Sequence, residues 1–282
     1  MKNLIKKMIF KKNRNYTTIN GEKIKKHNIN IEFCFSKRRN FGDTLTPYIF
    51  DYFKRNFKLE KQRNKKTTHL LMCGSIIGFG NFDAIVWGSG ILSKEYANSI
   101  LNNKQIKYDI RAVRGPLTRS ILLKRGDSVP EIYGDPAILL PLIYNKEVAK
   151  KYDISIINHY ADGYNKNKFK KFHTIDIFCD DIYKIIDEIR ASNLVISSAL
   201  HGIIVAESYG IPTIWLKSSN LDDFKYLDWY GSTLREEKDI AFMDNINLSV
   251  PSKVAQPPID IIKKMQSDLI KSFPFDLWKH SK

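Results

Sequence analysis

Short apolar runs alternate with amphipathic helical patterns along most of this 282-residue chain, and this alternation restricts its fold more than any other feature. A first series predicts strands at residues 31–35, 69–73, 84–87 and 110–113, with helices at residues 43–57 and 116–123. A second series predicts strands at residues 154–157, 174–178, 194–197 and 213–216, with helices at residues 181–191, 201–209 and 257–273. Strands that alternate with helices form parallel sheets joined by right-handed crossovers, so the sequence predicts an α/β protein.

Residues 136–147 separate the two series and are predicted to form a linker. A chain of this length accommodates two mid-sized domains. We therefore expect two Rossmann-like domains that face each other across a cleft. The predicted division is a basic N-terminal segment at residues 1–29, an N-terminal α/β domain at residues 30–145 and a C-terminal α/β domain with a closing helix at residues 146–282.

The segment Ser-Ser-Ala-Leu-His-Gly at residues 197–202 lies between an apolar strand pattern and a helical pattern that stops at Gly210. This order places His201 and free N–H groups of Gly202 and Ile203 at a helix N-terminus. Such a terminus carries partial positive charge and accommodates a phosphate or carboxylate. An imidazole beside it could also move a proton. The alternative is a turn in which His201 only caps the helix.

Two further segments follow predicted strands, where α/β folds bind their ligands. Asn40 and Gly42 leave backbone that a ligand can approach, while Asp43 is expected to cap the following helix. Arg114, in an Arg-Gly-Pro segment, is expected to grip a carboxylate or phosphate with its planar guanidinium. The alternative for Arg114 is a structural ion pair with Asp135 or Asp43.

Glycine turns follow other predicted strands, at Gly74-Ser75 and Gly88-Ser89-Gly90, but glycine at a strand end often only permits a turn. His159, after the strand at 154–157, is a second candidate for proton transfer, although a lone histidine there is more often structural. The chain has no dinucleotide fingerprint, phosphate loop or nucleophile elbow. No carboxylate pair or histidine cluster indicates a metal. We therefore expect neither a metal nor a cofactor.

The chain carries 46 Lys and Arg residues against 30 Asp and Glu residues, a formal charge of +16. This excess suits an anionic substrate or an acidic membrane surface, unless it only reflects a lysine-rich genome. No nucleic-acid-binding signature is present, so nucleic acid is not an expected partner. Residues 1–12 fit either a basic amphipathic helix on a membrane or a frayed tail. The three cysteines share no metal-ligand spacing and favour a cytoplasmic location, with peripheral contact at the inner face of the membrane left open.

Five short motifs occur in a definite order: Asn40-Phe41-Gly42-Asp43, Trp87-Gly88-Ser89-Gly90, Val113-Arg114-Gly115-Pro116-Leu117-Thr118, Gly134-Asp135-Pro136-Ala137 and Ser197-Ser198-Ala199-Leu200-His201-Gly202. In this order they resemble the motifs of the polysaccharide pyruvyltransferase family. The stretch at residues 224–230 is also similar to one that those proteins carry after the His-Gly motif. The resemblance covers roughly residues 30–235.

The resemblance implies a pair of Rossmann-type domains like those of glycosyltransferase B enzymes. It also implies transfer of the enolpyruvyl unit of phosphoenolpyruvate to a sugar of a cell-surface polysaccharide or its lipid-linked precursor, forming a ketal. Arg114 and His201 would then act on phosphoenolpyruvate, with His201 as general acid or base. The other residues expected to contact substrate are Asn40, Gly42, Asp43, Ser89, Gly90, Asp135, Ser198, Leu200, Gly202, Lys217 and Lys225.

One position departs from the family pattern. The family places an Arg-Leu-His triplet at the donor, whereas this chain has Ala199 in place of the arginine. Loss of that cation leaves the donor in question unless Lys217 or Lys225 substitutes for it.

Two other interpretations remain. A glycosyltransferase B enzyme would bind the diphosphate of a nucleotide sugar at the helix that starts near His201 and reach a ribose with Glu207. A non-catalytic protein that binds anionic glycan or membrane would keep only the scaffold, in agreement with Ala199 and the high positive charge.

Overall fold

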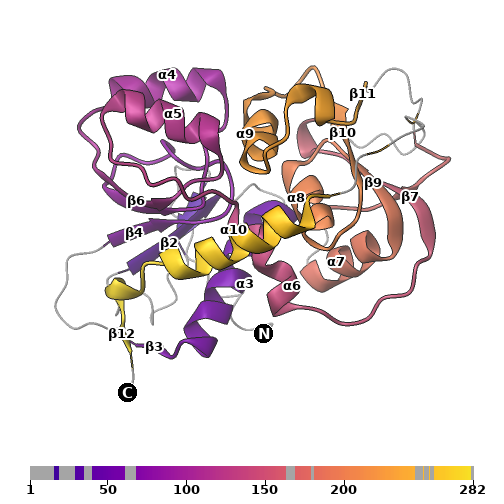
Figure 1. Ribbon diagram of the computed structural model, residues 1–282, viewed down its shortest axis with the longest axis horizontal. Helices are drawn as coiled ribbons and strands as arrows, with labels where there is room; N and C mark the ends of the chain where they lie inside the picture. Colours follow the sequence, from indigo (N-terminus) through magenta and orange to yellow (C-terminus); the bar gives the residue numbers. More distant parts are fainter. Residues whose placement is uncertain are drawn as a thin grey trace.

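The computed structural model describes residues 16–18, 29–34, 40–60, 68–162, 169–178, 181–244, 250, 254 and 257–280. The expected membrane helix or frayed tail at residues 1–12 lies outside these residues. The described elements form a mixed α/β structure with two five-stranded sheets, as the alternating sequence pattern predicts (Figure 1). None of the described helices has the length and apolar character that a membrane crossing requires.

The first sheet has the strand order β1-β2-β4-β5-β6. Its strands are β1 (Tyr16–Thr18), β2 (Ile29–Cys34), β4 (Thr68–Leu71), β5 (Ala84–Trp87) and β6 (Tyr108–Ala112). All neighbours pair in parallel except β1, which runs antiparallel to β2. The helices that connect this part of the chain are α3 (Phe41–Asn56), α4 (Lys94–Asn102) and α5 (Pro116–Arg125).

The second sheet has the strand order β11-β10-β9-β7-β8, and every pair in it is parallel. Its strands are β7 (Tyr152–Ile157), β8 (His173–Thr174), β9 (Ser192–Ser197), β10 (Thr213–Lys217) and β11 (Phe242–Asp244). The helices in this half are α7 (Ile182–Arg190), α8 (Leu200–Ser208) and α9 (Phe224–Ser232). The strand predicted at 174–178 is therefore much shorter than expected, and α4 and α9 are helices that the sequence patterns did not reveal.

The first part of the segment predicted as a linker is instead part of the core. Residues 136–139 form the 3-10 helix η1 (Pro136–Leu139), followed by α6 (Leu140–Ile143). Pro136 to Leu140 are buried, because η1 packs against α3, α8 and α10 (Ile259–Ser272). Residues 144–147 form no helix or strand and are exposed or half-buried. The prediction was wrong for residues 136–140, because a short run rich in proline and apolar residues fits both a solvated connection and a buried turn.

Helix α10 connects the two halves of the molecule (Figure 1). The indole N–H of Trp87 at the end of β5 donates to the carbonyl of Leu269, at 2.9 Å. The amide of Gln266 donates to the carbonyl of Ile138 in η1, at 2.6 Å, and α10 also contacts α8. At the C-terminus, β12 (Lys279–His280) pairs with β3 (Leu59–Glu60). The closing helix thus packs on elements of both sheets, while the predicted domain boundary at 145/146 stays a prediction.

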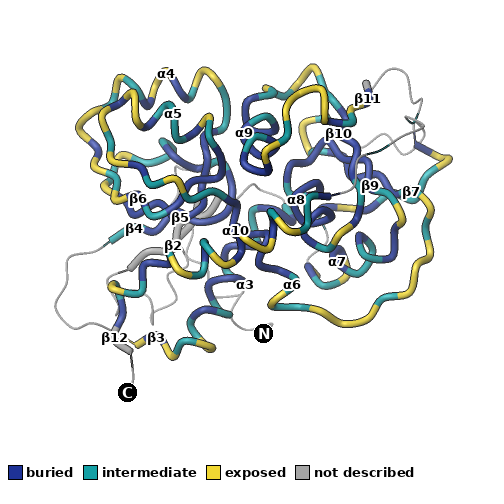
Figure 2. The backbone as a smooth tube through the Cα atoms, viewed as in Figure 1, coloured by how far each residue is buried: buried dark blue, intermediate teal, exposed yellow. Residues whose placement is uncertain are grey.

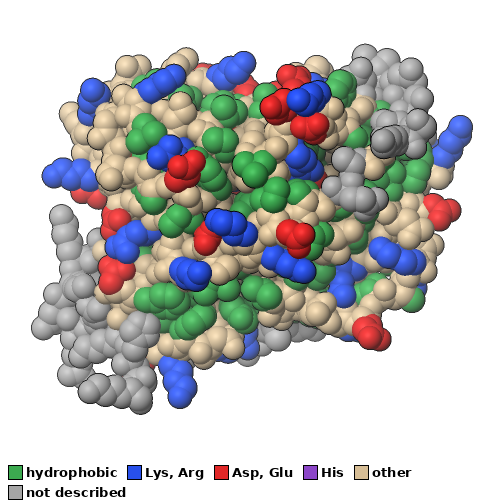
Figure 3. Space-filling model, in the orientation of Figure 1, with side chains coloured by type: hydrophobic (Ala, Val, Ile, Leu, Met, Phe, Trp, Pro, Cys, Tyr) green, Lys and Arg blue, Asp and Glu red, His purple; other side chains and the backbone are tan. Residues whose placement is uncertain are grey.

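The largest cluster of buried apolar residues runs between the two sheets and includes side chains of α3, η1, α8 and α10 (Figure 2). Aromatic rings form its densest part, where Phe53 stacks on Phe273 with ring centroids 4.2 Å apart. At the surface, Lys and Arg side chains on the face shown in Figure 3 are scattered among Asp and Glu and do not gather into one basic patch.

Candidate active site

A cavity of about 420 Å³ lies where loops from both sheets meet. Its walls come from segments that follow the carboxyl ends of β2, β4, β7, β9 and β10, which is where open α/β sheets bind ligands. Seven of the predicted site residues or their neighbours in the motifs line it: Asn40, Gly42, Asp43, Leu200, His201, Gly202 and Lys225. The sequence motifs from the two halves of the chain therefore converge on one space.

His201 lies against the first turn of α3. A Cβ atom added at Gly42 would be 2.1 Å from Nδ1 of His201, so only glycine at this position leaves room for the imidazole. The other ring nitrogen, Nε2, lies 3.4 Å from Oδ2 of Asp135. Gly42 thus makes space for the ring, and Asp135 faces its inner edge.

Asp135 is fully buried beneath the cavity. Its carboxylate accepts hydrogen bonds from the N–H groups of Gly74 (3.2 Å) and Ala137 (3.0 Å). Burial by itself raises the pKa of Asp135, but the His201 ring, the Ala137 N–H and the positive charge of Arg114 outweigh burial and lower it. Asp135 is therefore an ionised partner that orients His201, and it does not line the cavity.

The N-terminus of α8 differs in detail from the sequence prediction. The N–H groups of Gly202 and Ile203 are not free, because both donate to the carbonyl of Ala199, at 2.9 and 3.3 Å. At the start of α8 the donors without an acceptor among the described residues are those of Leu200 and His201, two positions earlier. The helix starts at Leu200, one residue before the predicted start, and Gly202 bonds three residues back to Ala199, so the free donors lie before Gly202.

Lys225, in the first turn of α9, also lines the cavity. Its side chain is buried, with the residue 7% exposed. The ammonium lies 5.1 Å from the centre of the Tyr226 ring, and no hydrogen bond or ion pair joins it to a described residue. Burial, together with the charge of Arg114, lowers the pKa of Lys225 to about 8, against opposing effects of Asp43, Asp162 and Asp222. A buried ammonium that faces a cavity without a carboxylate in contact is suited to an anionic ligand.

Asp43 does not cap α3 as predicted. The cap is Asn40, whose side-chain oxygen accepts from the N–H of Gly42 at 3.1 Å, and α3 already begins at Phe41. Asp43 instead lies in the first turn and lines the cavity. Burial raises the pKa of Asp43 to about 7, although the charges of His201 and Lys225 act to lower it.

The loop after β7 forms another part of the wall, through His159 and Tyr160. Burial and the charges of Lys225 and His201 lower the pKa of His159 to about 3, so its imidazole is neutral near pH 7. Ser198 does not line the cavity. Its hydroxyl accepts from the N–H of His159 at 2.8 Å and donates to Asp162 at 2.5 Å, and so holds this loop in place.

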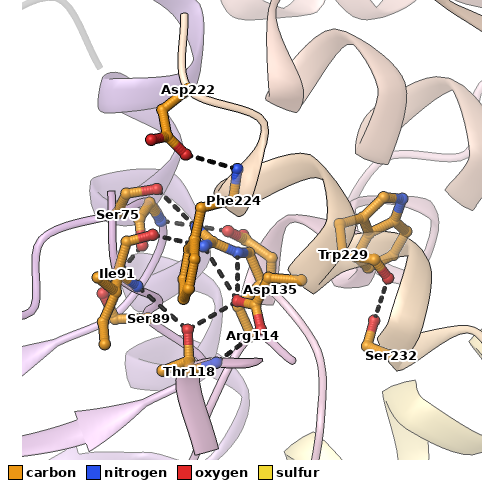
Figure 4. Close-up of polar contacts among 12 residues, drawn as sticks. Ser75, Ser89, Ile91, Arg114, Thr118, Asp135, Asp222, Phe224, Trp229 and Ser232 are labelled. Carbon is orange, nitrogen blue, oxygen red and sulfur yellow. Dashed lines mark hydrogen bonds and ion pairs between the residues drawn. The ribbon is translucent and has the colours of Figure 1, made fainter. Parts of the chain in front are cut away.

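Arg114 lies behind the cavity wall and is fully buried (Figure 4). Its guanidinium donates to Asp228 (3.0 Å), to the hydroxyl of Ser75 (2.5 Å) and to the carbonyl of Ile91 (2.7 Å). The structural partner of Arg114 is thus Asp228, and neither Asp135 nor Asp43. Ser75 lines the cavity, so Arg114 reaches the site through that hydroxyl.

Ser89 and Gly90 support this arrangement and do not line the cavity. The hydroxyl of Ser89 donates to the carbonyl of Gly74 at 2.9 Å. A Cβ atom at Gly90 would be 2.3 Å from Cζ of Arg114, so glycine here makes room for the guanidinium. The motif Trp-Gly-Ser-Gly therefore shapes the wall from behind.

Lys217 and Glu207 also lie outside the cavity. The ammonium of Lys217 is 3.7 Å from Asp223 and lies over the rings of Trp215 and Phe242. Glu207 is buried and accepts from Arg235, Thr213 and Trp229. A carboxylate with all its acceptor positions used inside the core is not available to a ribose, which contradicts the role considered for Glu207.

Three contributors were missed in the sequence: Ser75, Asp162 and Asp228. Ser75 belongs to the turn Gly74-Ser75, and Asp228 belongs to the stretch at residues 224–230. The residues next to them in the sequence do not indicate that either side chain contacts Arg114. Asp162 gives no sequence signal. In the described part of the chain, no group of three or more His, Cys, Asp or Glu residues could hold a metal ion.

Comparison with known proteins assigns this chain to a protein family. A family model for polysaccharide pyruvyl transferase matches residues 3–220. The chain belongs to the polysaccharide pyruvyl transferase family.

Two relatives extend the comparison. An uncharacterized protein of Acanthamoeba polyphaga mimivirus is 30% identical over 238 residues, which cover 76% of this chain and 79% of that protein. The succinoglycan biosynthesis protein ExoV of Rhizobium meliloti is 23% identical over 222 residues, covering 69% of this chain and 61% of ExoV. Among solved structures, an uncharacterized protein of Klebsiella pneumoniae aligns over 77% of this chain and 93% of its own, with 16% identity and a TM-score of 0.49.

Proposed function

We propose that this chain transfers the enolpyruvyl unit of phosphoenolpyruvate to hydroxyl groups of a cell-surface polysaccharide, or of its lipid-linked precursor, and forms a ketal. The observation that carries this proposal is the buried ammonium of Lys225, which no described residue meets with a hydrogen bond or ion pair, in the same cavity as His201. Membership of the polysaccharide pyruvyl transferase family supports the reaction class.

Phosphoenolpyruvate carries a carboxylate and a phosphate, and both need positive or hydrogen-bonding partners. Lys225 supplies a full charge, and the free N–H groups of Leu200 and His201 supply the partial charge of the α8 N-terminus. Lys225 lines the cavity together with Ala199, whereas Lys217 does not. We therefore assign to Lys225 the cation that Ala199 removes from the family triplet.

Formation of the ketal requires a proton at C3 of phosphoenolpyruvate and attack of sugar hydroxyls at C2, with inorganic phosphate leaving. His201 is assigned to the proton transfer to C3, because it lines the cavity and lies against an ionised carboxylate, Asp135. With Nε2 directed toward Asp135, Nδ1 is the nitrogen left to exchange a proton with substrate.

The architecture and location belong to the same proposal. The two parallel sheets with a cavity at their strand ends suit a pair of Rossmann-like domains of the glycosyltransferase B type. The cytoplasmic location, with the lipid-linked acceptor at the inner face of the membrane, rests on the cysteine content and family resemblance alone.

Thermal unfolding with candidate donors tests the choice of donor. A ligand present at about 100 times its dissociation constant stabilises the native state by ~2.7 kcal/mol, which gives a measurable rise in Tm. We expect a rise with phosphoenolpyruvate, and release of inorganic phosphate once a lipid-linked sugar acceptor is added. A rise with a uridine or cytidine diphospho-sugar and none with phosphoenolpyruvate would establish a glycosyltransferase instead.

Gly42→Ala is expected to reduce phosphate release at least tenfold. The added methyl group would overlap Nδ1 of His201, so the imidazole must move from its position beside Asp135. Overpacking of this kind costs about 1–3 kcal/mol, and displaced catalytic groups lose rate steeply. Gly231→Ala is the matched control, because an added Cβ there meets Pro116 at 2.9 Å and no residue of the cavity. Full activity of Gly42→Ala, measured beside this control, would show that the position of His201 is unimportant.

A further inference from the structure

The carboxyl group of Asp43 lines the cavity, and neither the fold nor donor binding explains its role there. It forms no hydrogen bond or ion pair with a described residue, and the cap of α3 is Asn40. The helix dipole gives an acidic residue in a first turn only about 0.3–1 kcal/mol at the surface. Placing a carboxylate in a half-buried wall costs more than that unless a ligand meets it.

Asp43 shares the cavity with two basic side chains from other elements. His201 approaches from α8 and Lys225 from α9, and both act on the Asp43 carboxyl electrostatically. No second carboxylate is among the groups that affect it. Asp43 therefore faces the two groups assigned to phosphoenolpyruvate, but its own charge repels that donor. A neutral partner with a proton to give, such as a sugar hydroxyl, fits beside it.

The proposed reaction has a step that no other assigned residue performs. As the acceptor oxygen bonds to C2 of phosphoenolpyruvate, the C2–C3 double bond takes a proton at C3 and the hydroxyl must lose its own proton. His201 is assigned to donate the proton to C3. A separate base must therefore accept the proton of the acceptor hydroxyl as its oxygen attacks C2. We propose that Asp43 is this base, and that it takes the proton of the acceptor hydroxyl while the oxygen attacks C2. This inference rests on the proposed function.

The protonation behaviour of Asp43 agrees with that role. Because burial raises its pKa to about 7, the carboxylate is basic enough to accept a proton near neutral pH, yet is ionised above pH 7. The turnover number should therefore rise with pH through about 7, since only the ionised form is active.

The test compares Asp43→Asn with Asp51→Asn, a change of the same type on the outer face of α3, where Asp51 pairs with Arg55. Each protein is assayed for the Tm shift produced by phosphoenolpyruvate and for phosphate release with acceptor between pH 5 and 9. We expect Asp43→Asn to keep the Tm shift, to release phosphate about 100- to 10,000-fold more slowly and to lose the rise through pH 7. Asp51→Asn should behave like the parent. Asp43→Ser is the second variant and should show the same loss.

Three results would overturn the inference. If Asp43→Asn keeps parental turnover, or keeps the rise through pH 7 in its residual activity, Asp43 is not the base, and the proposed function stands. If both Asp43 variants lose the Tm shift with phosphoenolpyruvate, Asp43 belongs to the donor site. If the parent releases no phosphate from phosphoenolpyruvate with any acceptor, the proposed function fails and the role of Asp43 fails with it.

Discussion

His201→Gln is expected to slow phosphate release by about 100- to 10,000-fold while the Tm stays within a few degrees of the parent value. Glutamine occupies a volume close to that of histidine, and its amide can donate to Asp135, so the buried carboxylate keeps a partner. What is lost is the imidazole assigned to proton transfer with the substrate. The loss should therefore appear in kcat, with the Tm shift produced by phosphoenolpyruvate largely retained.

His173→Gln is the matched control for this change. His173 lies in β8 at the opposite side of the second sheet, where it pairs with Glu188 at 3.1 Å and stacks on Tyr152. Its replacement should leave turnover unchanged. If His201→Gln keeps the parental turnover, His201 only fills space against Gly42. If both variants lose turnover equally, the cause is a general loss of stability.

The local features of the site were predictable because they depend on neighbours in the sequence. The strand, loop and helix around residues 197–209 follow from an apolar run, a polar turn and a glycine stop, and the structure places β9 and α8 there. Gly42 and His201 each follow the carboxyl end of a strand, where open α/β sheets bind ligands, and both line the cavity. The same rule did not separate them from Arg114, Ser89 and Ser198, which also follow strands but do not line the cavity.

The sequence did not predict two kinds of detail. One is the residue at which a helix begins, and the other is contact between segments far apart in the chain. Both Asn40 and Asp43 are good caps, and only the start of α3 at Phe41 decides between them. At α8 the helix begins one residue earlier than predicted, and the free donors are those of Leu200 and His201, not those of Gly202 and Ile203. Sequence patterns place helix ends no more finely than this.

The pairing of Arg114 shows the limit for distant contacts. Arg114 meets Asp228, which comes from α9 in the other half of the chain. Gly115 permits that approach, because a Cβ there would lie 1.9 Å from the carbonyl oxygen of Asp228. The residues around Arg114 and around Asp228 do not indicate this pairing in the sequence. Only the folded structure shows that Arg114 contacts the cavity wall through Ser75.

Lys225→Met is expected to weaken the binding of phosphoenolpyruvate by about 10- to 100-fold and, at the same time, to raise the Tm. A hydrogen bond to a charged group contributes about 1.5–3 kcal/mol, and each 1.4 kcal/mol is a factor of ten in affinity. The ammonium of Lys225 is buried beside the Tyr226 ring with no hydrogen bond or ion pair to a described residue, so its removal relieves a desolvation cost in the ligand-free protein. Gain of stability with loss of affinity distinguishes a binding residue from a structural one.

The pH dependence and a matched lysine make this prediction specific. Because burial lowers the pKa of Lys225 to about 8, the side chain is charged below that pH, and the parent should lose affinity for phosphoenolpyruvate as the pH rises above 8. Lys225→Met should lack this loss. Lys217→Met removes the same charge outside the cavity, where Lys217 is 3.7 Å from Asp223, and should leave affinity unchanged. If calorimetric titration gave Lys225→Met the parental affinity, or gave Lys217→Met the larger loss, the cation that replaces the missing arginine at Ala199 would not be Lys225.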